Sequence, residues 1–265
     1  IDRSRGLGDV YKRQILDTDL GLDIKKTIAH AEKVIDKGCH GVVFFGSTGQ
    51  SQLISLSDKI NLINNLPSNS YKENFIIGTG LNSLSDTISL MKISMSLGFV
   101  RFLIMPPAYY KYDDQDVFNF YSNIIKVIPD SKIILYNFEK LSGYKFSENI
   151  VYKLVENFPD QIIGVKDSSY NLFEKLKINN FSLMPGSETK LLKGLELGCS
   201  GIITATTNAT ASLARDVYEN FIQKKKNNLN KKLCDVRAVF EQYNLISGLH
   251  TFYKMGYTRL TLSII

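Results

Sequence analysis

The stretch QIIGVKDSS, residues 161–169, determines how the rest of the chain is interpreted. Four of its first five residues are apolar or glycine, which predicts a strand covered on both faces, as in parallel sheets. The strand ends at Lys166, where an apolar core meets a polar loop. Partial removal from water favours the neutral amine, which can attack a carbonyl and form a Schiff base. An ordinary solvated lysine at a strand edge is the alternative that this stretch alone leaves open.

The composition is that of an ordinary globular protein. The chain has 265 residues, enough for one large domain or two small ones, and is 44% hydrophobic and 22% charged. Its apolar runs fall short of the roughly 18 residues that span a membrane, and its polar N-terminus does not resemble a signal peptide. The three widely spaced cysteines, Cys39, Cys199 and Cys234, predict reduced thiols rather than a disulfide framework or a zinc site. We therefore expect a cytoplasmic protein without a membrane partner.

The net charge of +6 raises the possibility of nucleic-acid binding. The basic residues are scattered, however, and the one dense cluster, residues 224–226 with Lys231 and Lys232, falls in a helical, asparagine-rich stretch. A solvated helix face explains such a cluster better than an RNA-binding patch. We expect no nucleic-acid partner, although a basic protein still attracts small anionic substrates.

Strand and helix patterns alternate along the chain. Helical periodicity begins at Leu22 and stops at Gly38, and further helices are predicted at 57–66, 85–97, 115–127, 147–157, 189–197 and from 211 onward. The predicted strands are residues 41–45, 75–77, 100–105, 132–136, 161–166, 181–184 and 201–204. Such alternation predicts parallel strands joined by right-handed crossovers.

The number of units predicts a TIM (β/α)8 barrel, since seven to eight units in about 250 residues is the size of that fold. A doubly wound sheet is the second choice, but Gly78-Thr79-Gly80 lacks the third glycine of a dinucleotide-binding loop. We divide the chain into 1–14, a non-native-looking segment; 15–221, the barrel; and 222–265, a C-terminal helical region. The missing strand belongs before residue 22, and its loss or replacement would leave an exposed sheet edge.

Reactive groups of a barrel gather at the carboxyl ends of its strands. Those ends carry one lysine with hydroxyl, phenol and backbone amide groups: Ser47, Thr48, Tyr109, Tyr110, Tyr136, Asn137, Lys166, residues 186–188 and Thr204. His30 and His250 fall on predicted helices and His40 precedes its strand, so a histidine-based hydrolase or a metal site is poorly supported. A lysine beside phenols suits imine chemistry, in which tyrosine moves protons.

These residues resemble the dihydrodipicolinate synthase / N-acetylneuraminate lyase family. The motifs Gly46-Ser47-Thr48-Gly49-Gln50, Tyr136-Asn137, Gly164-Val165-Lys166-Asp167-Ser168-Ser169 and Gly186-Ser187-Glu188 occur in the family's order, and residues 201–208 match a further segment. The resemblance runs from about Leu22 to Phe221. It implies a TIM-barrel class I aldolase or lyase, a homotetramer or another homo-oligomer such as a dimer, that forms a Schiff base with pyruvate or a related 2-oxo acid.

The resemblance also implies roles for individual residues. Lys166 would form the imine, Tyr136 would be the proton shuttle, and Tyr110 resembles the tyrosine that neighbouring subunits contribute to the proton relay. Ser47 and Thr48 would hold the 2-oxo acid carboxylate, and Gly186 and Ile203 match positions lining its pocket. No cofactor or metal is implied, because the imine is covalent with the substrate.

Departures from the family pattern bear on the substrate. Leu141 stands where dihydrodipicolinate synthases carry the arginine that binds the aldehyde's carboxylate, and leucine cannot make that contact. Ser168, Glu188 and Thr204 match positions that bind sugar hydroxyls in the sugar-acid lyases. We therefore expect a lyase of the N-acetylneuraminate or 2-keto-3-deoxy sugar acid type. The alternatives are 4-hydroxy-tetrahydrodipicolinate synthase, which Leu141 disfavours, and a catalytically silent barrel that binds 2-oxo acids.

Overall fold

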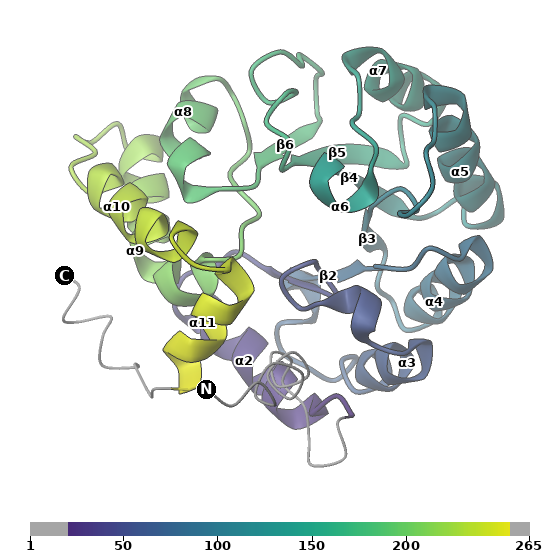
Figure 1. Ribbon diagram of the computed structural model, residues 1–265, viewed down its shortest axis with the longest axis horizontal. Helices are drawn as coiled ribbons and strands as arrows, with labels where there is room; N and C mark the ends of the chain where they lie inside the picture. Colours follow the sequence, from purple (N-terminus) through teal and green to yellow (C-terminus); the bar gives the residue numbers. More distant parts are fainter. Residues whose placement is uncertain (1–20, 255–265) are drawn as a thin grey trace, which may run out of the picture.

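The computed structural model describes residues 21–254, which form a curved parallel sheet with helices along its outer side (Figure 1). The six strands are hydrogen-bonded in the order β1-β2-β3-β4-β5-β6, and every neighbouring pair is parallel. The strands are β1 (Val42–Phe44), β2 (Phe75–Gly78), β3 (Arg101–Ile104), β4 (Lys132–Asn137), β5 (Ile162–Asp167) and β6 (Ser182–Pro185). Sequence order is therefore spatial order, so the strands' carboxyl ends all lie at one edge of the sheet.

The crossover helices begin at the capping residues that their sequences provide. The side chains of Ser55, Ser83, Asp113 and Ser147 each accept a hydrogen bond from a backbone N–H of the first helical turn. The helices and helical turns up to residue 196 are α2 (Ile24–Asp36), η1 (Ser51–Leu53), α3 (Leu56–Asn64), η2 (Lys72–Asn74), α4 (Leu84–Ser96), α5 (Asp114–Val127), α6 (Glu139–Ser142), α7 (Glu148–Asn157), η3 (Glu188–Lys190) and α8 (Leu191–Glu196).

Six of the seven predicted strands are confirmed, and the prediction of a strand at residues 201–204 is wrong. Residues 201–204 have no regular secondary structure, and two backbone hydrogen bonds join residues 200–203 to β6, from Ser200 N to Leu183 O and from Ile203 N to Pro185 O. This run lies beside β6 without the continuous ladder of a strand. The segment 1–14, the strand expected before residue 22 and the chain beyond residue 254 lie outside the described residues.

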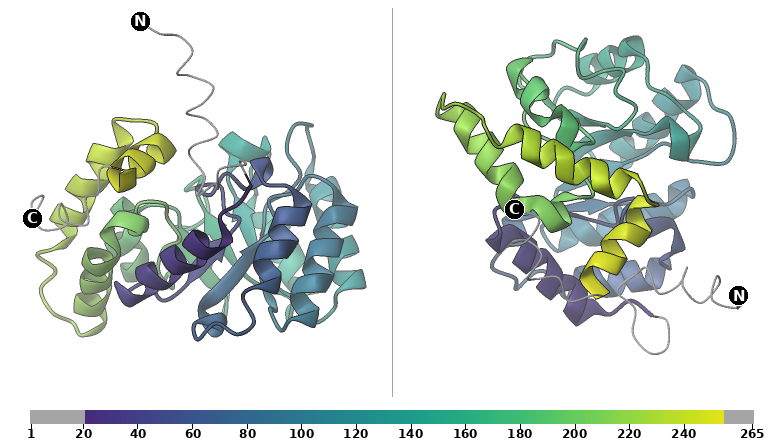
Figure 2. Two further views of the ribbon diagram at one scale, coloured as in Figure 1. Left: turned by 90° about the horizontal axis from the view of Figure 1, so that it is seen from below. Right: turned by 60° about the vertical axis from the view of Figure 1, so that its left-hand side comes forward.

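The two faces of the sheet are both apolar, as expected for parallel strands. Outward side chains such as Phe102, Leu135 and Val165 join the main core beneath the helices. Inward side chains form a second cluster around Leu103, Ile134 and Tyr136. Figure 2 shows the helices lying against the outer side of the strands. The chemistry-bearing inward residues therefore face the hollow of the curve.

The pairing of β4 with β5 contains one irregularity. Ile133 pairs with Ile162, but the next residue, Ile134, pairs with Gly164, so Ile163 has no partner of its own. Glycine is required at the bulge because a Cβ at residue 164 would lie 2.4 Å from the carbonyl oxygen of Ser182. Beyond this point Tyr136 stands opposite Lys166.

Three helices follow the sheet: α9 (Thr207–Ile222), α10 (Asn230–Glu241) and α11 (Leu245–Lys254). Leu191 and Leu195 of α8, Val217 of α9 and Leu233 of α10 form a core cluster of their own. This cluster includes residues from both sides of the boundary predicted at 221 and 222. No helix within residues 21–254 is long and apolar enough to cross a membrane.

Candidate active site

Lys166 and Tyr136 are register partners on the neighbouring strands β5 and β4. Lys166 is 7% exposed, and its Nζ lies 4.0 Å from the centroid of the Tyr136 ring. The electron-rich face of the phenol ring attracts a protonated amine and holds it in one place. The amine is therefore directed along the inner side of the sheet beside a phenol.

Ser47 extends this pair into a chain of three polar groups. It follows β1, and its Oγ lies 2.8 Å from the Tyr136 hydroxyl, a hydrogen bond in which either oxygen can donate. Residues contributed by β1, β4 and β5 thus meet, although they are 89 and 30 positions apart in the chain. The expectation that these strand ends converge is confirmed by this geometry.

A cavity of about 860 Å³ opens beside the lysine. Among the residues that the sequence singled out, its lining includes Ser47, Thr48, Lys166, Ile203 and Thr204. The wall is otherwise largely apolar, with Val43, Ile76 and Met184 on the strand side. A mostly apolar hollow with a few convergent polar groups is what a small-molecule site requires.

A smaller pocket of about 190 Å³ lies on the other side of Ser47 and Tyr136. Leu141 of α6 lines this pocket together with Met105, and its side chain is 44% exposed. Ser47 lines both hollows, whereas Lys166 lines only the larger one, and Tyr136 and Leu141 line only the smaller one.

Gly186 and Ser168 are in close contact next to the lysine strand. A Cβ at residue 186 would lie 2.3 Å from the Oγ of Ser168, so a larger residue there would displace this loop. Gly186 N donates to Asp167 O, and Ser168 N donates to Asn137 O. The two predicted site residues thus join the ends of β4, β5 and β6.

Asp167, the residue after the lysine, holds the loop that follows β5. Its buried carboxylate accepts hydrogen bonds from the backbone N–H groups of Tyr170, Leu172 and Phe173, and from the side chain of Asn137. Asn137 in turn accepts from Phe146 N. The carboxylate oxygens of Asp167, next to Lys166 in the chain, therefore accept hydrogen bonds mainly from the loop that follows β5.

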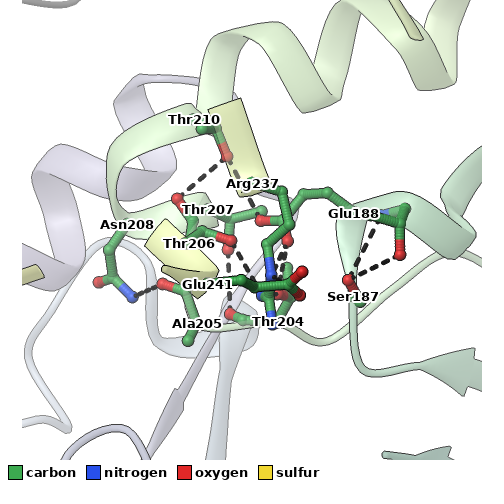
Figure 3. A network of polar contacts seen from close by, with 11 residues as sticks. Ser187, Glu188, Thr204, Ala205, Thr206, Thr207, Asn208, Thr210, Arg237 and Glu241 are labelled. Atoms are coloured by element: carbon green, nitrogen blue, oxygen red, sulfur yellow. Dashed lines mark hydrogen bonds and ion pairs between the residues drawn. The ribbon is translucent and has the colours of Figure 1, made fainter. Parts of the chain in front are cut away.

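Glu188 is fully buried and forms an ion pair with Arg237 of α10 (Figure 3). Its Oε2 accepts from Thr204 Oγ1 at 2.8 Å and from Arg237 Nη1 at 3.1 Å, and its Oε1 accepts from Thr210 at 3.4 Å. Glu188 is not among the described residues that line the cavity, whereas Thr204 is. The direct contact with sugar hydroxyls expected of Glu188 stays a prediction, and its hydrogen-bond partners in the structure are protein groups.

Arg237 was not singled out by the sequence. Burial by itself lowers the pKa of this guanidinium, but Glu188 and Glu241 outweigh the burial and raise the pKa above its ordinary value. The signal that was available is its position on the buried side of α10, four residues after Leu233. A charge on an apolar helix face indicates a buried partner, but it does not indicate which partner.

Tyr110 lies apart from these groups within the described chain. It is 68% exposed, and its ring packs edge-on against Tyr109 at a centroid distance of 5.0 Å. Tyr109 has a φ of 85°, an uncommon backbone conformation for a residue with a side chain. The expected role of Tyr110 in another subunit's site stays a prediction.

Lys59 of α3 is a second buried lysine that the sequence did not single out. It is fully buried, and its Nζ donates to Thr79 O at 2.8 Å and to Gly80 O at 3.3 Å. Burial lowers the pKa of this ammonium from 10.5 to about 8. Lys59 belongs to neither of the two hollows described above.

The histidines His30 and His40 lie along the wall of the large cavity. His30 Nε2 is 2.8 Å from Asn208 Oδ1, and burial lowers the pKa of both imidazoles. Within residues 21–254, no three His, Cys, Asp or Glu side chains gather where they could hold a metal ion. The lysine, phenol and hydroxyl groups at the strand ends are suited to nucleophilic attack by an amine, proton transfer by a phenol and hydrogen bonding to an anion.

Comparison with known proteins agrees with this chemistry. Residues 15–261 match the model of the dihydrodipicolinate synthetase family, whose members are pyruvate-dependent lyases and aldolases. An uncharacterized DapA-like lyase of Chloroflexus aurantiacus is 30% identical over 71% of this chain, a match that spans 65% of that protein. The 2-dehydro-3-deoxy-D-gluconate/2-dehydro-3-deoxy-phosphogluconate aldolase of Picrophilus torridus is 26% identical over 81% of this chain and 80% of its own.

Solved structures show the same arrangement of strands and helices. The chloride-inhibited dihydrodipicolinate synthase of Acinetobacter baumannii, complexed with pyruvate, superposes with a TM-score of 0.81. It is 25% identical, and the alignment covers 91% of this chain and 85% of the synthase. The relatives thus include both a sugar-acid aldolase and a synthase, so similarity alone leaves the aldehyde substrate open.

Proposed function

We propose that this chain, which belongs to the dihydrodipicolinate synthetase family, is a Schiff-base lyase that joins or separates pyruvate and a hydroxylated aldehyde, as in sugar-acid aldolases. The observation that carries the proposal is the contact between Lys166 and Tyr136, with Nζ 4.0 Å from the ring centroid and the phenol bonded to Ser47. The similarity to the Picrophilus aldolase supports the sugar-acid class, and the pyruvate complex of the Acinetobacter synthase supports the 2-oxo acid.

In the proposed cleavage, the Lys166 amine attacks the C2 carbonyl of a 4-hydroxy-2-oxo acid, and water leaves to give an iminium. Tyr136 donates its phenol proton to the departing water, and the phenolate so formed accepts the proton of the C4 hydroxyl while the C3–C4 bond breaks. The bonding electron pair moves to C3 and the iminium, which produces an enamine and an aldehyde. Protonation at C3 and hydrolysis of the imine then release pyruvate and regenerate the lysine. The imine is formed with the substrate itself, so these steps use no further cofactor.

Ser47 and Thr48 have two roles in this mechanism. They border the cavity at the end of β1, where their hydroxyls and backbone N–H groups are suited to the carboxylate of the 2-oxo acid. Ser47 also holds the Tyr136 hydroxyl at 2.8 Å, within the range for proton transfer. The loop after β1 therefore positions both the carboxylate of the substrate and the Tyr136 hydroxyl that transfers the proton.

The test is trapping of the imine. The protein is incubated with pyruvate and sodium borohydride, and the adduct is mapped by peptide mass spectrometry. We expect one reduced pyruvate adduct, located on Lys166, and aldehyde release from at least one 2-keto-3-deoxy sugar acid or sialic acid. Absence of the adduct would overturn the enzyme proposal, and an adduct without aldehyde release would favour a silent 2-oxo-acid-binding protein.

A second candidate is 4-hydroxy-tetrahydrodipicolinate synthase, the activity named for several relatives, among them that of Karelsulcia muelleri at 27% identity. Leu141 is half-exposed beside Tyr136 and provides no charge for a carboxylate-bearing aldehyde. If a semialdehyde is the true partner, Leu141→Arg should accelerate condensation about tenfold by supplying a bidentate anion contact. The sugar-acid proposal expects no acceleration.

We also infer a closed (β/α)8 barrel and a homo-oligomer, for which the exposed Tyr109–Tyr110 pair offers a contact surface. Light scattering tests the assembly, since a monomer at working concentration would contradict it. If Tyr110 reaches a neighbouring site, Tyr110→Phe should lower kcat without weakening the oligomer. A crystal structure with an open sheet would contradict the closed barrel.

A further inference from the structure

Arg237 is a buried charged group to which the proposed mechanism gives no role. It comes from α10, yet its Nη1 donates to Glu188, Thr204 and Thr206, each at 3.1 Å (Figure 3). Its Nε donates to Glu241 on its own helix at 2.7 Å. The side chain is 7% exposed, so these contacts lie inside the protein. We call Glu188, Thr204, Thr206, Arg237 and Glu241 the arginine network.

Thr204 is the member of the arginine network that also lines the cavity containing Lys166. A threonine hydroxyl has one proton and two lone pairs. The proton is donated to Glu188 Oε2 at 2.8 Å, and one lone pair accepts from Arg237 Nη1. One lone pair remains, so a ligand group that reaches this hydroxyl from the cavity can donate a hydrogen bond to it but cannot accept one from it.

Arg237 itself is committed to protein partners. Its charge is balanced by two carboxylates, the buried Glu188 and the half-exposed Glu241. Arginine that is already paired and hydrogen-bonded in this way gives little to an incoming anion. The network therefore does not form a receptor for the carboxylate of a substrate, even though it contains an arginine close to the cavity.

We propose that Arg237 is a positioning residue that, with Glu188, fixes the Thr204 hydroxyl as a hydrogen-bond acceptor and thereby selects an aldehyde that carries a hydroxyl over one that carries a carboxylate. The inference rests on the proposed lyase function and sharpens its substrate class. A hydroxyl of the aldehyde can donate a hydrogen bond to the free lone pair of Thr204. A carboxylate has no proton to donate, so its oxygen and the Thr204 oxygen would repel each other. Arg237 of α10, which does not itself line the cavity, thus determines the preference between the two kinds of aldehyde.

The test compares condensation of pyruvate with two aldehydes, D-glyceraldehyde for the hydroxyl and succinic semialdehyde for the carboxylate. Removing Arg237 alone would leave Glu188 as a buried unpaired charge and risks misfolding. The main variant is therefore the double replacement Arg237→Met with Glu188→Gln, which removes both charges. Lys231→Met with Asp235→Asn is the matched control, because it removes an exposed ion pair from the same helix.

We expect the wild type to prefer glyceraldehyde in kcat/KM, and the double variant to lose about tenfold of that preference, the effect of one misdirected hydrogen bond. The loss should appear as a higher KM for glyceraldehyde at nearly constant kcat. The control variant should keep the wild-type ratio. An unchanged ratio in the double variant, a wild-type preference for the semialdehyde or reaction with neither aldehyde would overturn the inference.

Two further measurements separate a positioning role from a general structural one. In a Thr204→Val background the hydroxyl is already absent, so the double replacement should change the ratio less than about twofold if Arg237 acts through Thr204. A full further effect would overturn the inference. Borohydride trapping of pyruvate on Lys166 is run on every protein: failure in the wild type contradicts the lyase function, whereas trapping with an unchanged aldehyde ratio contradicts the role of Arg237 alone.

Discussion

Lys166 and Lys59 are both buried lysines near the carboxyl ends of strands, but their surroundings differ. Lys166 lies at the edge of the large cavity, with its amine over the Tyr136 ring. Lys59 is enclosed, and its amine donates hydrogen bonds to the carbonyl groups of Thr79 and Gly80 after β2. Lys59 thus fastens a loop, while Lys166 faces a space that a substrate can enter.

The difference shows that burial alone does not identify a nucleophilic lysine. Burial lowers the pKa of Lys59 to about 8, which by itself is the usual sign of a reactive amine. Its hydrogen bonds and lack of access argue against that role. Reactivity at Lys166 depends instead on an open cavity, a nearby phenol and strands that hold both in register.

The largest expected effect separates the two lysines directly. Lys166→Met should abolish the borohydride-trapped pyruvate adduct and lower lyase activity more than about a thousandfold, because no other amine replaces the electron sink. Lys59→Met should retain the adduct in the folded protein. Intact-mass spectrometry after trapping measures both. A trapped adduct on Lys59 in either protein would contradict this comparison.

Tyr136→Phe tests whether the phenol acts by its hydroxyl or by its ring. The ring over Lys166 remains, so the pyruvate adduct should still form, but the proton acceptor and the bond to Ser47 are lost. We expect kcat for cleavage to fall about a hundredfold or more, the typical contribution of a general acid–base group. Single-turnover kinetics with pre-formed adduct measures this step. A decrease in kcat of less than threefold would assign the proton transfer to another group.

Asp167 is the carboxylate counterpart of Lys59 in holding a strand-end loop. Asp167→Asn replaces one oxygen by an NH2 group that faces backbone N–H donors, so at least one buried hydrogen bond is lost. We expect the free energy of unfolding to fall by about 3 kcal/mol, measured by urea denaturation. Asp130→Asn, an exposed aspartate before β4, serves as control and should change stability by less than about 0.5 kcal/mol. Equal effects of the two replacements would contradict the role of Asp167.

The last comparison concerns the pH dependence of stability that Lys59 causes. Its pKa is 10.5 when unperturbed and about 8 in the fold, so between these values the unfolded chain binds more protons than the folded one. Stability therefore rises from pH 8 to 10.5, is fully present above 10.5 and is lost as pH falls through 8. The rise is on the order of 3 kcal/mol.

Denaturation of wild type and Lys59→Met at a series of pH values isolates this contribution, since other titrating groups cancel in the difference. The difference in unfolding free energy between the wild type and Lys59→Met should change between pH 8 and 10.5 and stay constant below pH 8. Lys153→Met, which removes a lysine lying over Phe118 at the surface, is the matched control for the loss of a lysine. A flat difference for Lys59→Met would contradict its lowered pKa.

The sequence allowed prediction of the elements whose signals are local. Apolar runs ending in polar residues located Ser47, Tyr136 and Lys166 at strand ends, and parallel topology brought those ends together. Glu188 was also located, but its partner was not. Its ion pair with Arg237 depends on how α10 packs on α8 and α9, a contact across 49 residues for which local patterns carry no information.

Lys59 illustrates the same limit from within a helix. It lies on the face of α3 that also carries Leu62 and Ile63, so the pattern shows a charge on an apolar face. The path of the loop after β2 determines which carbonyl groups accept hydrogen bonds from the Lys59 amine. In a similar way residues 201–204 have the composition of a strand, and their incomplete pairing with β6 depends on neighbours distant in the chain.

The bulge at Ile163 and Gly164 has a consequence for which side of the sheet receives the lysine. Strand side chains alternate between faces, and Ile162 belongs to the outer core while Ile163 faces inward. Strict alternation from Ile162 would assign every even-numbered residue of β5 to the outer face, and Lys166 would point among the helices. The extra residue inverts this parity, and Val165 faces outward while Lys166 faces in. A regular strand of the same sequence, without the bulge, would contain every reactive residue and yet turn the amine away from Tyr136.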